Sequence, residues 1–306
     1  MIDKKIIIGT RGSKLALNYA ERAKNEICSK FNIKEKNLEI KKIITEGDKI
    51  KDVRLSDTGG KGLFSKTIEN ELLDNKIDIA VHALKDMPSD ETSGLTTNCF
   101  LERNDPREVL ISRDKKKFND LNKGSIIGTS SFRREFQFKR IRNDLKYKLI
   151  RGNVDTRIKK LNEKNFDAII LSFAGLHSLK LDQNITQIFS TSEIIPSAGQ
   201  GTIALQCREN DGEIIKILKK INHELTYKCV IAERDVLKTL NGDCETPIGV
   251  FANIKNNELN LETELFSLDG KDRFYESLST ELKNFKKIGL EVGTILKKKS
   301  KNSYKR

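Results

Sequence analysis

The chain has 306 residues, of which 37% are hydrophobic and 33% are charged. This length predicts two or three compact units, and the composition is typical of a globular protein with an ionised surface. No apolar run is long enough to cross a bilayer, which argues against a membrane-spanning chain. The formal net charge of +13 favours an anionic partner, although we expect the lysine tracts 115–117 and 297–299 to be solvated surface.

The N-terminus and the cysteines indicate a reducing compartment. Residues 1–5 lead straight into the strand-like stretch 6–8, without the apolar region and cleavage site of a signal peptide. We therefore expect a cytoplasmic protein, with the plastid stroma as the alternative if a transit peptide has been removed. The cysteines are odd in number, scattered and without a Cys-x-x-Cys pair, so neither a disulfide framework nor a metal site is expected. They are Cys28, Cys99, Cys207, Cys229 and Cys244.

Strand and helix patterns alternate through the first hundred residues. Continuous apolar runs indicate strands that are buried on both faces, as in α/β sheets, and apolar residues at helical spacing indicate helices between them. A glycine-rich loop, 58–62, precedes the second helix. The expected strands are 5–9, 38–44 and 77–84, and the expected helices are 13–31 and 63–73.

From about Asp105 a second unit repeats this alternation, and after Asn222 the pattern changes to that of a separate α+β domain. We expect segment 196–201 to form a hinge or tight loop, and the lysine-rich last ten residues to be disordered. The remaining predicted elements are strands 108–112, 125–128, 148–150, 167–172 and 202–208, helices 131–142, 154–160 and 224–240, a loop around Cys244, three short strands, and a final helix from Leu282.

Three predicted strand-to-helix turns carry basic residues. Arg11 follows the first strand and Ser13 can cap the next helix, while segments 128–134 and 151–157 place two arginines each in the same setting. One such turn alone is weak evidence for an anion-binding site, because an arginine near a helix start is more often a surface residue. Helix N-termini attract anions, guanidinium groups bind carboxylates bidentately, and ligands gather at the carboxyl ends of strands. Together the turns predict a site for a small molecule with several negative charges.

Two further residues stand out by position. Asp86 lies at the carboxyl end of the apolar strand 77–84, close to the basic turns, where a site carboxylate and a turn-forming aspartate are equally good interpretations. Cys244 lies in a loop marked by glycine and proline, whereas the other four cysteines lie in apolar stretches where cysteine behaves as a small hydrophobic residue. Position therefore favours Cys244 as the reactive thiol, without naming its reaction.

Six segments, in this order along the chain, resemble the signature segments of the hydroxymethylbilane synthases, also called porphobilinogen deaminases. They occur at family-like spacing and extend the resemblance from the start of the chain to about residue 253. The segments are 9–13, 59–64, 78–88, 128–134, 151–157 and 242–249.

The resemblance implies a transferase, monomeric and without metal, with two α/β lobes like type II periplasmic binding proteins, the active site between them, and a small C-terminal α+β domain. It implies that Cys244 holds a dipyrromethane cofactor through a thioether. Four porphobilinogen molecules lose ammonia and are added to this primer, and hydrolysis then releases 1-hydroxymethylbilane. The implied domains are 1–101 with 197–220, then 102–196, then 221–306.

The resemblance also implies roles for individual residues. Asp86 falls on the catalytic carboxylate, and Lys61 and Phe64 fall on a lid loop. Asp57 and Ser178 depart from the family, because basic residues are common at both positions. The positions implied to bind the carboxylates of cofactor and substrate are Arg11, Ser13, Lys85, Thr129, Ser130, Ser131, Arg133, Arg134, Arg151, Gly152, Asn153, Arg157 and Gln200.

Two other classes of protein compete with this interpretation. A non-catalytic binding module would share the bilobal fold, but it has no need of a third domain or of its loop cysteine. A nucleic-acid binder would suit the charge, but tryptophan is absent, aromatic residues make up 6%, and no nucleic-acid recognition motif occurs.

Overall fold

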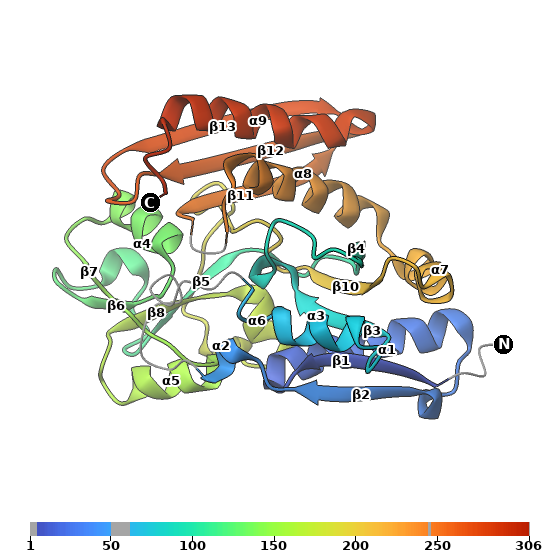
Figure 1. Ribbon diagram of the computed structural model, residues 1–306. Coiled ribbons are helices and arrows are strands. Elements are labelled where there is room, and N and C mark those ends of the chain that lie inside the picture. Colours follow the sequence, from blue (N-terminus) through green and yellow to red (C-terminus); the bar gives the residue numbers. More distant parts are fainter. Residues whose placement is uncertain (1–4, 50–61, 244–245, 306) are drawn as a thin grey trace.

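A computed structural model describes residues 5–49, 62–243 and 246–305. These residues form a mixed α/β protein with two five-stranded sheets and one three-stranded sheet. The C-terminal sheet and its helices lie across the other two units (Figure 1). The predicted α/β class with a small C-terminal α+β part is therefore confirmed.

The first sheet has the strand order β2-β1-β3-β10-β4. Strand β1 pairs in parallel with β2 and β3, and β10 runs antiparallel to β3 and β4. Its core is made by apolar side chains of these strands and of the helices that pack on them. The strands are β1 (Ile6–Arg11), β2 (Leu38–Ile43), β3 (Ile79–Ala83), β4 (Leu95–Phe100) and β10 (Ile203–Arg208), and the helices are α1 (Lys14–Phe31), α2 (Glu46–Lys49), α3 (Lys66–Leu73) and α7 (Gly212–Ile221).

The second sheet repeats this arrangement, with the order β7-β6-β8-β5-β9. Strands β7, β6 and β8 are parallel, and β5 runs antiparallel to β8 and β9. Two lobes of like topology are what the sequence resemblance implied. The strands are β5 (Glu108–Ser112), β6 (Ile126–Gly128), β7 (Lys146–Lys148), β8 (Ala168–Ser172) and β9 (Gln187–Ile188), and the helices are α4 (Phe132–Ile141), α5 (Val154–Asn162) and α6 (Phe173–Ser178).

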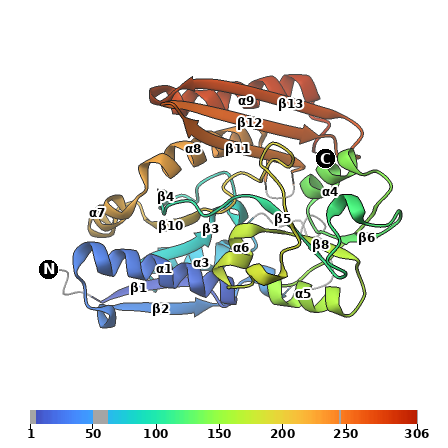
Figure 2. The ribbon, with the colours of Figure 1, turned by 180° about the vertical axis from the view of Figure 1, so that it is seen from behind.

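The third sheet is an antiparallel meander, which α8 and α9 cover on one face (Figure 2). Apolar residues of both helices and all three strands share one core. The elements are α8 (Glu224–Leu240), β11 (Ile248–Lys255), β12 (Glu258–Phe266), β13 (Arg273–Glu281) and α9 (Phe285–Ser300). Short 3-10 helices complete the described chain: η1 (Glu35–Asn37), η3 (Leu84–Asp86), η4 (Phe118–Asp120), η5 (Asp182–Asn184) and η6 (Leu282–Asn284).

Helix ends are fixed by local chemistry that the sequence already contained. Ser13 accepts a hydrogen bond from the Ala16 amide at 3.3 Å and so caps α1, as predicted. Helix α8 ends at Asn241, whose φ of 52° is the left-handed conformation that asparagine tolerates. The predicted ranges 108–112 and 224–240 agree with β5 and α8, and other predicted elements differ at their ends by a few residues.

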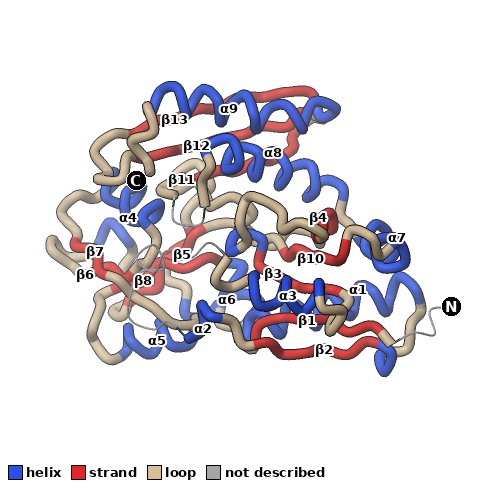
Figure 3. Tube along the Cα trace, viewed as in Figure 1, coloured by secondary structure: helices blue, strands red, loops and turns tan. Residues whose placement is uncertain are grey.

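Several short or amphipathic elements were not predicted, namely α2, α6, α7 and β4, which Figure 3 labels, and the two-residue strand β9. The expectation of a disordered C-terminus is wrong. Helix α9 continues to Ser300, and Tyr304 is only 1% exposed, with its hydroxyl donating to the Leu240 carbonyl at 2.9 Å. One buried aromatic side chain thus holds in place a lysine-rich C-terminal segment that its composition alone predicts to be disordered. The domain boundaries given above stay a prediction.

Replacing Tyr304 tests whether the C-terminal residues stabilise the core between the three-stranded sheet and helices α8 and α9. Truncation of a buried aromatic side chain to alanine costs about 3–5 kcal/mol. We therefore expect Tyr304→Ala to lower the melting temperature by several degrees, and Tyr304→Phe, which loses one hydrogen bond, to lower it less. The matched control is Lys305→Ala, since Lys305 is exposed. An unchanged melting temperature in Tyr304→Ala would mean that the tail is not held.

Candidate active site

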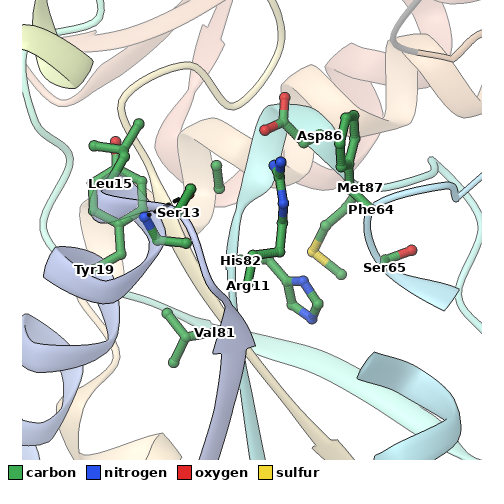
Figure 4. Close-up of a pocket in the computed structure, with 12 residues that line it drawn as sticks. Arg11, Ser13, Leu15, Tyr19, Phe64, Ser65, Val81, His82, Asp86 and Met87 are labelled. Atoms are coloured by element: carbon green, nitrogen blue, oxygen red, sulfur yellow. Dashed lines mark hydrogen bonds between the residues drawn. The ribbon is translucent and has the colours of Figure 1, made fainter. Parts of the chain in front are cut away.

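A pocket lies where β1 and β3 end, at the carboxyl edge of the first sheet (Figure 4). Arg11 is the last residue of β1, Ser13 caps α1, Asp86 lies in η3 after β3, and Phe64 precedes α3. Four predicted site residues from distant parts of the chain therefore line one pocket. The other lining residues are Leu15, Ala16, Tyr19, Ser65, Val81, His82, Ala83 and Met87.

Arg11 is held by a carboxylate that the sequence analysis did not single out. Its Nε donates to Asp48 Oδ1 at 3.2 Å, and its Nη2 forms an ion pair with the same carboxylate. The guanidinium also lies over the Phe64 ring, 3.9 Å from the centroid. Burial alone would raise the pKa of Asp48, but hydrogen bonds from Arg11 and Thr45 outweigh it and lower that pKa. Asp48 is therefore charged at neutral pH.

Asp86 differs from Asp48, because its carboxylate makes no hydrogen bond or ion pair with another described residue. Its charge nevertheless reaches its neighbours. Burial, and then the negative charge of Asp86, raise the pKa of Tyr19 to about 12. Burial lowers the pKa of His82 to about 4, so its imidazole is neutral at pH 7. Among the described residues, the pocket thus presents one cation in an ion pair and one carboxylate that forms no ion pair, although the charges of Lys85 and Arg157 act on that carboxylate.

A second cluster lies around Glu108, the first residue of β5, which is fully buried. Arg133 Nη2 lies 2.7 Å from Glu108 Oε1, and Arg134 Nη2 lies 2.9 Å from Oε2. Burial alone would raise the pKa of Glu108, but the guanidinium groups of Arg134 and Arg133 lower it to about 2. Arg133 also donates to the Ile195 carbonyl at 2.9 Å. Both predicted arginines are thus positioned by a protein carboxylate.

The cations around Glu108 are not balanced by it. Burial, and then repulsion from Arg134, lower the pKa of Lys85 to about 8. Burial, Arg134 and Arg151 together lower the pKa of Arg157 to about 10. Arg134 Nε is buried and has no hydrogen-bond partner among the described residues. Packing like charges together in a partly dry site is costly, so this arrangement fits a ligand that brings several carboxylates.

The hydroxyl and glycine residues of the predicted turns shape the chain around these cations. Thr129 Oγ1 accepts from the Ser131 amide at 3.2 Å, and Ser131 Oγ in turn accepts from the Arg134 amide at 3.4 Å. Ser130, between them, is half-buried. Gly152 has a φ of +113°, which few residues other than glycine adopt.

Three other predicted residues contact this region. The Gly152 carbonyl accepts from Arg157 Nε at 2.8 Å, and Asn153 is the N-cap of α5, with no hydrogen bond from its side chain to that helix. Gln200 is fully buried and donates to Glu108 Oε1 at 3.0 Å. The structure therefore gathers these residues about the arginines, although no single pocket contains them all.

Three residues discussed from the sequence, Cys244, Lys61 and Asp57, lie outside the described residues. The chain just before Cys244 is placed by a hydrogen bond from Ser89 Oγ to the Gly242 carbonyl at 3.0 Å. Ser89 is three residues from Asp86, so the third unit contacts the segment that carries the pocket carboxylate. Among the other cysteines, Cys99, Cys207 and Cys229 are buried and Cys28 is half-buried, and burial raises the pKa of each of these four thiols.

Ser178, at a position where the resemblance expects a basic residue, lies on α6 against α1. Its carbonyl accepts from Asn18 Nδ2 at 2.6 Å, its hydroxyl donates to the Ala174 carbonyl at 2.7 Å, and its side chain also contacts the Tyr19 hydroxyl. Tyr19, Asp48 and Glu108 were not predicted as site residues. A single charge at the start of the apolar strand 108–112 was the one signal that could have drawn attention to Glu108.

Two other kinds of site are absent from the described ranges. No group of three or more His, Cys, Asp or Glu side chains there could hold a metal ion. No helix in those ranges is long and apolar enough to cross a membrane.

Comparison with known proteins identifies the family. Residues 6–216 match the family described as "Porphobilinogen deaminase, dipyromethane cofactor binding domain", and residues 227–298 match "Porphobilinogen deaminase, C-terminal domain". The chain belongs to the porphobilinogen deaminase family, whose first domain binds a dipyrromethane cofactor. This result confirms the predicted resemblance and favours an enzyme of tetrapyrrole biosynthesis over a binding module or a nucleic-acid binder.

Relatives match nearly the whole chain. A porphobilinogen deaminase of Staphylococcus epidermidis is 41% identical, covering 96% of this chain and 95% of its own, and one of a Geobacillus species is 43% identical, covering 96% and 94%. Among solved structures, a substrate-binding domain of a putative amino acid ABC transporter from Streptococcus pneumoniae is 14% identical, with a TM-score of 0.44 over 71% of this chain and 92% of that one. That likeness is too low to carry an argument.

Replacing Glu108 by glutamine tests whether it stabilises the basic cluster. Breaking a buried ion pair by removing one partner costs about 3–5 kcal/mol. Because folding lowers the pKa of Glu108 to about 2, its contribution is present above the pKa of an unfolded glutamate and is lost as the pH falls towards 2. We expect Glu108→Gln to melt well below wild type at pH 7, and the difference to shrink progressively below about pH 4.5. A difference that does not depend on pH would contradict the ion-pair assignment.

Proposed function

We propose that the protein is a transferase that makes 1-hydroxymethylbilane from four molecules of porphobilinogen. The observation that carries this proposal is the excess of partly buried cations around Glu108, beside a pocket whose carboxylate, Asp86, forms no ion pair with a described residue. Porphobilinogen carries an acetate and a propionate, so a growing chain of pyrroles brings many carboxylates to one site. We further propose that the enzyme works as a monomer in the cytoplasm.

The residues present fit a dipyrromethane held near Asp86. Its four carboxylates would neutralise the positive charge of Lys85, Arg134 and Arg157. One of them would also accept a hydrogen bond from Arg134 Nε, which has no partner among the described residues. Attachment through Cys244 is supported by the hydrogen bond between Ser89 and Gly242, which brings the chain on one side of that cysteine against the segment after Asp86. When bound, the cofactor supplies the free pyrrole carbon to which new units are added.

We assign the binding of the cofactor and substrate carboxylates to two sets of residues. Arg11 and Ser13 would bind at the pocket, where Arg11 Nη1 makes no hydrogen bond with another described residue. The second set binds further along the chain of pyrroles and consists of Lys85, Thr129, Ser130, Ser131, Arg133, Arg134, Arg151, Gly152, Asn153, Arg157 and Gln200. Of these, Thr129, Gly152 and Gln200 would act mainly by shaping the backbone or holding Glu108.

Asp86 is assigned to catalysis. Positive charge develops on the pyrrole ring as ammonia leaves, and again as the new carbon–carbon bond forms. A half-buried carboxylate that is already in place beside the ring stabilises such charge at little cost in reorganisation. Phe64, whose ring lies against Arg11, would cover the pocket together with Lys61.

The first test is the attachment of the cofactor. Purified wild-type protein should carry extra mass equal to two pyrrole units, because the cofactor is covalent, and Cys244→Ser should lack that mass and consume no porphobilinogen. Intact-protein mass spectrometry measures both. The matched control is Cys28→Ser, since Cys28 is the described cysteine that is not fully buried. Extra mass that persists in Cys244→Ser would place the attachment elsewhere.

The second test separates catalysis from binding at Asp86. Asp86→Asn keeps the size of the side chain and removes its charge, and losing one preorganised electrostatic stabiliser costs about a hundredfold to a thousandfold in rate. We expect cofactor-loaded Asp86→Asn to bind porphobilinogen but to consume it slowly in a single turnover, with Asp86→Glu in between. Thermal melting confirms the fold of each variant. Near-normal turnover in Asp86→Asn would leave Asp86 as a turn residue.

A further inference from the structure

Arg11 and Asp86 line the same pocket, and they carry opposite charges without forming an ion pair (Figure 4). An arginine side chain is long and flexible, and a guanidinium in a pocket binds a carboxylate strongly. The natural partner of Arg11 inside the pocket would therefore be Asp86. Lys85 and Arg157 already act on Asp86 through their charge, and Tyr19 and His82 also face it. An ion pair with Arg11 would offset still more of the negative charge that the proposed reaction needs.

Arg11 instead pairs with Asp48. Asp48 binds the Nε and Nη2 edge of Arg11, and so fixes the plane of the guanidinium against the Phe64 ring at 3.9 Å. Only Nη1 is then left to face a ligand. A planar group that is held on one edge and one face has little freedom to turn towards another carboxylate.

Asp48 is itself held in place, so it acts as a rigid support. Its Oδ2 accepts from the Thr45 amide at 3.2 Å and from the Thr45 hydroxyl at 2.7 Å, and Thr45 is fully buried. The neighbouring Gly47 donates its amide to the Leu63 carbonyl at 2.9 Å. A Cβ at Gly47 would lie 2.4 Å from the Phe64 ring, so a glycine is needed for this close approach.

We propose that Asp48 is a positioning residue for the reaction: by holding Arg11 it keeps the guanidinium away from Asp86 and leaves that carboxylate to the reacting pyrrole. The pair of Arg11 and Asp48 contributes no net charge to the pocket, while Nη1 stays available for a substrate carboxylate. Asp48 touches no reacting atom and acts through Arg11. This inference rests on the proposed role of Asp86.

The test is Asp48→Asn in the full, cofactor-loaded chain. The variant keeps the shape of the side chain but weakens its hold on Arg11, so Arg11 is free to pair with Asp86. We expect kcat to fall by about tenfold, less than the loss from deleting a stabiliser outright. A cation beside a carboxylate lowers its pKa, so the acid limb of the pH profile of kcat should move down by about one pH unit.

Two more variants make the result specific. In Arg11→Gln/Asp48→Asn the competing cation is gone, so kcat should recover relative to Asp48→Asn while KM rises, because a carboxylate partner is lost. Asp48→Glu, which keeps the charge, should stay closer to wild type. The matched control is Asp74→Asn, which breaks an exposed ion pair with Lys76 outside the pocket and should change neither kcat nor the acid limb. Thermal melting checks every fold.

An unchanged kcat and acid limb in Asp48→Asn would overturn the inference, as would a double variant no faster than Asp48→Asn alone. Either result would leave the proposed function standing, provided that wild type converts porphobilinogen to 1-hydroxymethylbilane. A wild-type protein that does not do so would instead reject the proposed function itself, before any variant is compared.

Discussion

The structure depends on a buried carboxylate that is outnumbered by cations. Glu108, the first residue of β5 in the second sheet, is fully buried, and Arg133 and Arg134 of α4 form ion pairs with it. Taking these ions out of water costs several kcal/mol for each, and their mutual attraction offsets this cost only in part. The remaining positive potential is what an anionic ligand would neutralise. Stability of the apo protein and affinity for the ligand are thus set by the same charges.

A second buried carboxylate joins the three units. Glu233 of α8 pairs with Arg103 at 2.6 Å, in the segment that crosses to the second sheet. The same side chain accepts from the Gly199 amide at 2.6 Å, where the chain returns to the first sheet, and from the Ala252 amide in β11 at 2.8 Å. Both oxygens of Glu233 accept from Arg103, and each accepts in addition from a backbone amide in another part of the fold. A fully buried charge is tolerated here because all its partners are present.

Local signals account for what the sequence could predict. Ser13, Asn241 and the periodic run 224–240 set helix ends through short-range chemistry, and apolar runs set the strands. Tyr304 shows where this reasoning fails, because its burial depends on Leu240, 64 residues away. The same holds at the site. Strand ends indicated which cations gather, but nothing local indicates that Asp48 rather than Asp86 pairs with Arg11, since that choice is made by the tertiary packing of Thr45 and Phe64.

Ser178 shows how this chain distributes its charge. At a position where a basic residue is common in the family, α6 instead presents a small hydroxyl that contacts Tyr19 of α1. A cation there would lie against Tyr19, which lines the pocket together with Asp86, and in the proposed function it would compete with the reacting ring for the charge of that carboxylate. The chain instead keeps its uncompensated cations around Lys85 and Arg157, where burial and mutual repulsion already lower their pKa values. In the function proposed above, these cations bind carboxylates and also act through their charge on Asp86, which itself forms no ion pair with a described residue.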